Sequence, residues 1–193
     1  MRVIAGEFRS RRLKTLPGLE LRPTPDRLRE ALFSVAGARV PGCTFVDAYA
    51  GCGAVGIEAL SRGAAGAVFL DESRAAVRVI LENLKALGLE GRAQVICGPA
   101  VPSLGGISAG IVFLDPPYDR EREYGRALDL LGRLPPPLVV AQHAYRFSLE
   151  ESYGSLRRYR VLRQGDNALS FFAPRAEPAM SSLRAPVLNS GTK

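Results

Sequence analysis

Short apolar runs alternate with helix-like segments through the middle of this 193-residue chain. Apolar runs stand at 44–46, 67–70, 93–97, 111–114 and 138–141, and the segments 54–62 and 73–87 carry apolar residues at helical spacing. Runs that are apolar on both faces are typical of parallel strands covered by helices. The pattern predicts an α/β fold with an open, doubly wound and mostly parallel sheet. Near the end, 159–163 and 168–173 flank Gly165-Asp166-Asn167, which predicts an antiparallel C-terminal hairpin.

A glycine-rich turn follows the first predicted strand and opens a helix, in the order Gly51-Cys52-Gly53-Ala54-Val55-Gly56. Such a turn lets the backbone approach a nucleoside-containing ligand, either a dinucleotide or S-adenosylmethionine. Asp71 ends the second strand, where it can accept hydrogen bonds from ribose hydroxyls. Asp47, just before the turn, would repel a pyrophosphate but suits a ligand with an amino group and a sulfonium. The turn therefore favours S-adenosylmethionine without excluding a dinucleotide.

The fourth predicted strand runs directly into Asp115-Pro116-Pro117-Tyr118. Two prolines end the strand abruptly and hold the carboxylate on a stiff backbone. The exocyclic amine of a nucleobase is a poor nucleophile, because its lone pair is spread into the ring. The Asp115 carboxylate and the Pro116 carbonyl could accept its two N–H groups and stabilise the positive charge that develops during methyl transfer, while Tyr118 stacks on the base. The segment predicts catalysis by Asp115 to Tyr118 without a metal.

The net charge of +7 is concentrated at the two ends of the chain. Residues 1–29 hold eight basic and three acidic side chains, residues 174–193 hold three and one, and the remainder sums to zero. Localised arginine-rich basicity suits phosphate recognition, although a solvated basic arm without a partner would look the same. We expect a basic N-terminal arm and helix over 1–37, with Thr24 capping and Pro25 opening the helix, a catalytic domain over 38–174 and a disordered tail over 175–193.

Cysteine usage and hydropathy limit the remaining classes. Cys43, Cys52 and Cys97 match neither a zinc pattern nor a disulfide framework, which indicates a reducing, cytoplasmic setting and implies no metal. No apolar stretch is long enough to span a membrane, and the early charges argue against a secretory signal. His143 is more typical of a strand end than of a proton acceptor.

These features resemble the bacterial RsmD-type methyltransferases, which modify the N2 amine of one guanine in 16S ribosomal RNA. The likeness covers about residues 2–172 and is carried by Arg2 to Gly6, Leu21 to Phe33, Asp47 to Ala64 and Phe113 to Tyr118. It implies a Rossmann-like class I methyltransferase with S-adenosylmethionine as cofactor and 16S RNA, free or in the small subunit, as partner. We further expect a monomer that does not associate with membranes.

The resemblance also implies site residues. The expected cofactor-binding residues are Asp47, Ala48, Tyr49, Gly51, Gly53, Asp71, Glu72, Pro99 and Ala100. The expected RNA-binding residues are Arg9, Arg11, Arg12, Lys14, Arg22, Thr24, Arg27 and Arg29. The chain departs from the family pattern at Cys97-Gly98-Pro99-Ala100, at Gln142-His143 and at Gln164-Gly165, of which the first weakens the assignment of Pro99 and Ala100.

Three alternatives stay open. An adenine-N6 methyltransferase acting on RNA or DNA would carry the same tetrapeptide at 115–118. An NAD-dependent oxidoreductase would use the same glycine turn. A non-catalytic RNA-binding module could retain the pocket as a relic.

Overall fold

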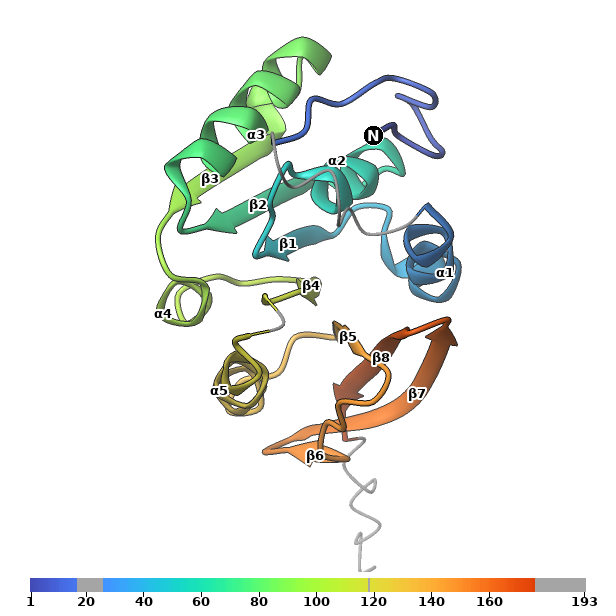
Figure 1. Cartoon of the computed structure of the whole chain (residues 1–193), viewed down its shortest axis with the longest axis vertical. Coiled ribbons are helices and arrows are strands. Elements are labelled where there is room, and N and C mark those ends of the chain that lie inside the picture. Colours follow the sequence, from blue (N-terminus) through green and yellow to red (C-terminus); the bar gives the residue numbers. More distant parts are fainter. Residues whose placement is uncertain (17–25, 118, 176–193) are drawn as a thin grey trace, which may run out of the picture.

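The computed structural model describes residues 1–16, 26–117 and 119–175. Within them lies one mixed sheet of eight strands in the order β3-β2-β1-β4-β5-β8-β7-β6 (Figure 1). Its parallel strands are β1 (Thr44–Ala48), β2 (Gly66–Asp71), β3 (Ala93–Cys97), β4 (Ile111–Leu114) and β5 (Leu138–Ala144). The antiparallel strands are β6 (Ser152–Tyr153), β7 (Leu156–Gln164) and β8 (Asn167–Pro174). The doubly wound sheet and its C-terminal hairpin are confirmed, and β6 adds a short strand that the sequence pattern did not indicate.

Helices cover both faces of the sheet. α1 (Asp26–Ala36), α2 (Ala54–Ser61) and α3 (Arg74–Leu87) pack on one face, where Phe45, Phe69 and Phe113 point. The short α4 (Ala100–Leu104) and α5 (Arg122–Leu131) cover the other face. The 3₁₀ turns η1 (Gly37–Arg39) and η2 (Glu90–Arg92) follow α1 and α3.

The ends of α3 follow the local sequence. Ser73 accepts a hydrogen bond from the Ala76 amide at 3.3 Å, and Gly88 ends the helix with a φ of +67°. The expected cap Thr24 and the proline after it lie outside the described residues.

The N-terminal arm, residues 1–16, is built into the domain instead of forming an appendage. It folds back on itself, with Arg2 bridged to Arg12, and it buries Val3 and Leu13 among α2, α3 and β2. Gly6 has a φ of +82° and passes so close to α2 that a Cβ would lie 1.9 Å from the Ser61 carbonyl oxygen. Only glycine fits this crossing. The expected separation of a basic arm from the catalytic body is therefore wrong for residues 1–16.

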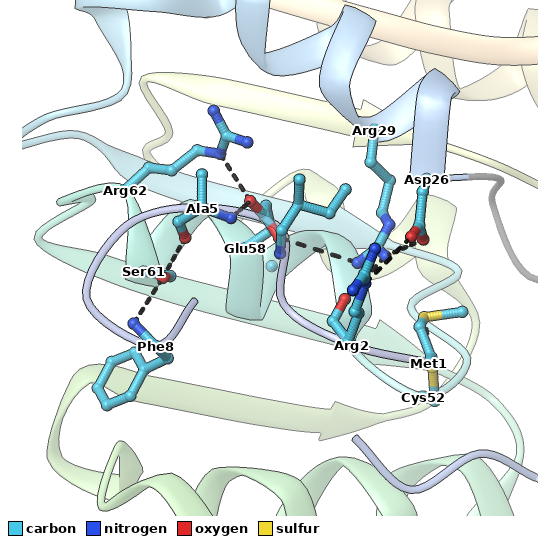
Figure 2. Close-up of polar contacts among 12 residues, drawn as sticks. Met1, Arg2, Ala5, Phe8, Asp26, Arg29, Cys52, Glu58, Ser61 and Arg62 are labelled. Atoms are coloured by element: carbon cyan, nitrogen blue, oxygen red, sulfur yellow. Dashed lines mark hydrogen bonds and ion pairs between the residues drawn. The ribbon is translucent and has the colours of Figure 1, made fainter. Parts of the chain in front are cut away.

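A buried carboxylate fixes the arm against α2 (Figure 2). Glu58 on α2 is fully buried and accepts hydrogen bonds from the amides of Ile4 at 2.7 Å and Ala5 at 3.0 Å. It also accepts from Arg62 Nε at 2.8 Å, and Arg29 Nη1 lies 3.9 Å away. The arm thus joins α1 and α2 through one polar cluster.

The expected tail lies outside the described residues apart from Arg175. None of the helices in the described ranges is long and apolar enough to cross a membrane.

Candidate functional site

A cavity of about 580 Å³ opens at the carboxyl ends of β1, β2 and β4. This is where ligands bind in doubly wound sheets. The glycine turn after β1 forms one wall and the segment after β4 forms the opposite wall, so the two sequence motifs meet in one space. Of the predicted site residues, the cavity is lined by Asp47, Tyr49, Gly51, Asp71, Glu72, Pro99, Ala100, Asp115, Pro116 and Pro117.

Each glycine of the turn is required at its position for a different physical reason. Gly51 has a φ of +58° and donates its N–H to Asp71 Oδ2 at 2.8 Å, which ties the turn to the end of β2. Gly53 has a φ of +79° at the start of α2. A Cβ on Gly56 would lie 2.3 Å from the Phe69 ring, so this third glycine permits α2 to pack on β2.

Asp47 lies beneath the turn with 2% of its surface exposed. Its Oδ2 accepts a hydrogen bond of 2.8 Å from the Gly56 amide in the first turn of α2. Burial raises the pKa of Asp47 to about 8, and the charges of Asp115 and Asp71 add to the rise, although the Gly56 hydrogen bond opposes it. A cationic group in the cavity would favour the ionised form of this carboxylate.

Asp71 and Glu72 end β2 in different settings. Asp71 is held by two amides, Gly51 and Ser73, each at 2.8 Å, and burial raises its pKa. Glu72 forms an ion pair of 2.5 Å with Arg120, which follows β4. This pair joins the two walls across the cavity.

Tyr49 supplies the most unusual backbone of the wall, because it is a non-glycine residue with a φ of +66°. Its hydroxyl donates to Glu123 Oε2 at 2.9 Å, and Glu123 is also paired with Arg126 at 2.7 Å. Burial and the Glu123 carboxylate raise the pKa of Tyr49, which keeps the phenol protonated. The strained backbone thus aims a fixed hydroxyl and its partner at the cavity.

The segment after β4 brings Asp115 to the cavity half-buried, with Pro116 buried and Pro117 exposed. Tyr118 lies outside the described residues. Asp115 thus lies across the cavity from the glycine turn, and its role at the reacting amine stays a prediction.

Carboxylates outnumber cations around this cavity. Asp47, Asp71, Glu72, Asp115 and Glu123 face it, while Arg120 and Arg126 are each paired with one of the glutamates. A pyrophosphate would be repelled by this field, whereas an ammonium or sulfonium would be attracted. The charge around the cavity therefore favours a cationic nucleoside ligand over NAD. No group of three His, Cys, Asp or Glu side chains suited to a metal occurs in the described part of the chain.

Two predicted cofactor residues do not line the cavity. Ala48 is fully buried against the α4 and α5 face, and Gly53 lies below the turn, where a Cβ would meet Phe69 and Ile80 at 3.3 Å. Both residues shape the turn, and their direct contact with the cofactor stays a prediction.

The predicted RNA-binding residues divide into three groups. Arg9, Arg11, Arg12, Lys14 and Arg27 are exposed on the arm and on α1. Arg22 and Thr24 lie outside the described residues. The prediction is wrong for Arg29, which is fully buried and donates Nη2 to Asp26 at 2.7 Å and to the Arg2 carbonyl at 2.9 Å. Its guanidinium holds the arm and cannot reach RNA.

His143 lies within β5, outside the lining of the cavity, as the sequence favoured. Its Nε2 is 2.9 Å from Ser170 Oγ, and Nδ1 is 2.9 Å from the Ala144 carbonyl oxygen. Burial lowers the pKa of His143, so its side chain is a neutral imidazole packed between β5 and β8.

Several lining residues were missed from the sequence. Met1, Thr15 and Leu16 bring the arm to the edge of the cavity, and Met1 Sδ lies 3.8 Å from Cys52 Sγ in the glycine turn. Arg120 lies just before α5 and Glu123 lies in its first turn, both shortly after the proline segment. The only signal for the last two was their closeness to Asp115 in the sequence.

Comparison with known proteins gives a consistent set of relatives. Residues 1–173 match the family model described as "Conserved hypothetical protein 95". The chain is 34% identical to "Putative rRNA methyltransferase YlbH" of Bacillus subtilis over 184 residues, which are 91% of this chain and 100% of that protein. It is 40% identical to "Ribosomal RNA small subunit methyltransferase D" of Escherichia coli over 122 residues, which are 62% of this chain and 61% of that protein.

A solved structure adds the fold. "Putative methyltransferase yhhF from Escherichia coli" superposes with a TM-score of 0.78 at 31% identity, covering 92% of this chain and 99% of that chain. The cavity, the glycine turn and the sheet thus occur together in a chain similar to methyltransferases over nearly all of its length.

Proposed function

We propose that methyl transfer to the exocyclic N2 amine of a guanine in 16S ribosomal RNA is the reaction of this chain, which belongs to the conserved hypothetical protein 95 family. The chain is an S-adenosylmethionine-dependent rRNA methyltransferase: its relatives are named as rRNA methyltransferases, and its methyltransferase fold and acidic cavity suit that cofactor. The choice of guanine N2 and of the small-subunit RNA is the proposed part. The meeting of Asp115 and the glycine turn in one acidic cavity supports methyl transfer to an amine, and the likeness to "Ribosomal RNA small subunit methyltransferase D" supports the small-subunit RNA and its guanine.

The cavity fits the proposed cofactor. Asp47 and Tyr49 would hold the methionine portion, whose ammonium favours the ionised Asp47 carboxylate. Asp71 and Glu72 would receive the ribose hydroxyls, and Pro99, Ala100 and Val101 offer an apolar wall to the adenine. When bound, S-adenosylmethionine supplies an electrophilic methyl group on a sulfonium.

The residues of the chain then act on the acceptor. Asp115 accepts an N–H of the guanine amine and holds the nitrogen towards the methyl group. The bound cofactor would supply the methyl group to the amine nitrogen and would keep the electron pair of the broken C–S bond on its sulfur. The positive charge that develops on nitrogen is stabilised by the Asp115 carboxylate, and one amine proton is then released to it and on to solvent. Tyr118 is proposed to stack on the base, which must be unpaired to enter.

Adenine N6 presents an amine with the same chemistry, so the identity of the base is decided by the product. Labelled S-adenosylmethionine is offered to unmodified 16S RNA and to unmodified small subunits, and the labelled nucleoside is identified. N2-methylguanosine supports the proposal, and N6-methyladenosine overturns the choice of base. Labelling of only one of the two substrates tells whether free RNA or the assembled subunit is used.

The role of Asp115 is tested by Asp115→Asn in the full-length protein. We expect turnover to fall at least about 100-fold, because a neutral amide stabilises the developing charge less, while affinity for the cofactor changes little. The matched control is Asp129→Asn, which removes an exposed carboxylate on α5 away from the cavity. Turnover of the Asp115 variant equal to that of the control would contradict the mechanism.

The proposal includes a cytoplasmic protein that works as a monomer. Sedimentation of the purified protein with and without 16S RNA measures the stoichiometry, and a stable dimer would correct this part alone.

A further inference from the structure

A second hollow lies far from the cofactor cavity, on the side of the sheet where β7 and β8 begin and end. We name it the arginine hollow. It is lined by Arg39, Arg157, Arg158, Tyr159, Ala173, Pro174 and Arg175. Arg39 ends η1, two of the arginines stand at the start of β7, and Arg175 follows β8. Three separate segments thus bring four guanidinium groups around one space.

The hollow carries unbalanced positive charge. None of its lining residues is acidic, and in the described ranges Arg39, Arg157 and Arg175 take part in no ion pair with a carboxylate. Arg158 is turned inward, with Nη1 donating to the Leu149 carbonyl at 2.8 Å. The Arg175 amide donates to the Ser155 carbonyl at 2.8 Å, which fixes the backbone at the rim. The exposed guanidinium groups of Arg39, Arg157 and Arg175, gathered around one hollow, are suited to phosphate oxygens.

The N-terminal arm looks more basic in sequence than it is in the folded protein. Arg2 pairs with Asp26 at 3.6 Å and Lys14 with Glu82 at 2.8 Å, and Arg29 is buried. Arg11 is directed to the Ala86 carbonyl at 3.4 Å. Part of the positive charge of the arm is therefore used within the protein, whereas Arg39, Arg157 and Arg175 of the hollow are exposed.

An aromatic side chain stands beside the arginines. Tyr159 is 49% exposed, and its ring lies 6.3 Å from the buried ring of Phe171, so one side rests on the core. An exposed tyrosine among arginines offers a base a stacking surface next to a phosphate site.

The strand β7 links the hollow to the catalytic edge. Leu156 pairs with Pro174 at one end, and Gln164 pairs with Asn167 at the other. Asn167 pairs in turn with Ala144, the carboxyl end of β5. At about 3.3 Å per residue, the seven steps from Arg157 to Gln164 span roughly 23 Å. Arg160 and Arg163 are exposed along this path.

We propose that the arginine hollow holds the phosphate backbone of the RNA substrate several nucleotides away from the methylated base. This assignment rests on the proposed function, because it takes RNA to be the substrate. It implies that an extended RNA is bound along β7, with its target base at the cofactor cavity.

A simpler role for these arginines is to protect an open strand edge. β6 pairs only with Leu156 and Arg157, and charged side chains on an open edge discourage pairing with another chain. That role does not account for Arg39 and Arg175, which lie off the strand and yet line the same hollow. The two roles are separated by choosing variants on and off β7.

The test uses Arg39→Gln/Arg157→Gln/Arg175→Gln in the full-length protein, with unmodified 16S RNA as the probe at several salt concentrations. We expect affinity to fall at least about tenfold and the slope of log affinity against log salt to decrease by about 2 to 3, close to one for each lost phosphate contact. Turnover at saturating RNA should stay within about twofold of the wild type, because the hollow is remote from Asp115. The control Arg78→Gln/Lys85→Gln, matched in number to the double variant described next, removes two exposed cations on α3 and should keep the wild-type slope.

The double variant Arg39→Gln/Arg175→Gln leaves β7 unchanged and should lower the slope by about 2. If gel filtration finds the triple variant aggregated while the double variant keeps the wild-type dependence of RNA affinity on salt, the arginines protect the strand edge and the proposal is overturned. A wild-type slope in a soluble triple variant also overturns it. If the wild-type enzyme transfers no methyl group to RNA, the proposed function fails instead, which the same labelled-methyl assay reveals.

Discussion

Removal of the Glu58 side chain is expected to unfold or strongly destabilise the protein, although the residue touches no ligand. Glu58 is fully buried on α2 and receives the amides of Ile4 and Ala5 and the Nε of Arg62, with Arg29 as a further charge (Figure 2). Glu58→Ala would leave the two arm amides without acceptors. It would also leave Arg29 fully buried with a single carboxylate partner, Asp26, which is 47% exposed.

The magnitude follows from these losses. Breaking a buried ion pair by removing one partner destabilises proteins by about 3–5 kcal/mol, because an uncompensated charge remains buried. Each of the two part-buried amides left without an acceptor adds up to about 1–3 kcal/mol. Domains of this size are stable by only about 5–15 kcal/mol, so Glu58→Ala is expected to remove a third of that or more. Arg29→Met should destabilise less, since Glu58 keeps three donors and since Arg29 Nε and Nη1 have no hydrogen-bond partner to lose.

Urea unfolding of the wild type, Glu58→Gln, Arg29→Met and the double variant forms a cycle that isolates the coupling between the two charges. We expect the loss of stability in the double variant to be smaller than the sum of the losses in the two single variants by at least about 1 kcal/mol. Affinity for the cofactor should fall with Glu58→Ala even in folded protein, because Met1, Thr15 and Leu16 of the arm line the cavity. A loss of stability below about 1 kcal/mol for Glu58→Ala would refute the proposed anchoring of the arm by Glu58. Additive losses in the cycle would refute the coupling between Glu58 and Arg29.

Two further expectations concern the cofactor turn. The folded-state pKa of Asp47, about 8, lies above its unfolded value, so its contribution to stability is present at low pH and is lost as pH rises from about 4 through 8. Asp47→Asn keeps an acceptor for the Gly56 amide and should make the free energy of unfolding depend less on pH, as measured by urea unfolding at pH 5.5, 7 and 8.5. An unchanged pH dependence would contradict the raised pKa. Gly56→Ala should destabilise the protein by about 1–3 kcal/mol, because the Cβ of the alanine would lie 2.3 Å from the Phe69 ring. Adding Phe69→Leu should restore part of the lost stability in thermal unfolding. No recovery in the double variant would argue against the clash.

Much of the fold could be predicted from local patterns. Strands apolar on both faces, Ser73 before α3 and Gly88 after it each leave a signal within a few residues, and the structure follows them. The meeting of Asp47, Asp71 and Asp115 was also predictable, since parallel strands end at one edge.

The position of the N-terminal arm was not predictable in the same way. Its anchor is Glu58, a single charged residue in a helix whose residues are all buried, and its partners Ile4 and Ala5 lie more than fifty residues earlier. No period or spacing links them. Arg29 was assigned to RNA from the family resemblance, and nothing in the local sequence shows that α1 carries it inward to Asp26 and to the arm.

Charge counted along the sequence therefore gives a different picture from charge counted in space. The segment 30–173 sums to zero, yet β7 holds Arg157, Arg158, Arg160 and Arg163 with no acid among its nine residues. The neutral sum hides this separation, because the balancing acids gather elsewhere, five of them around the cofactor cavity. Negative charge in the cavity attracts a cationic cofactor and repels RNA phosphates, while positive charge along β7 can attract those phosphates. An RNA bound this way would place its backbone on the hairpin and present only a nearly uncharged base to the carboxylates, which is the part of the nucleotide that has to enter for methyl transfer.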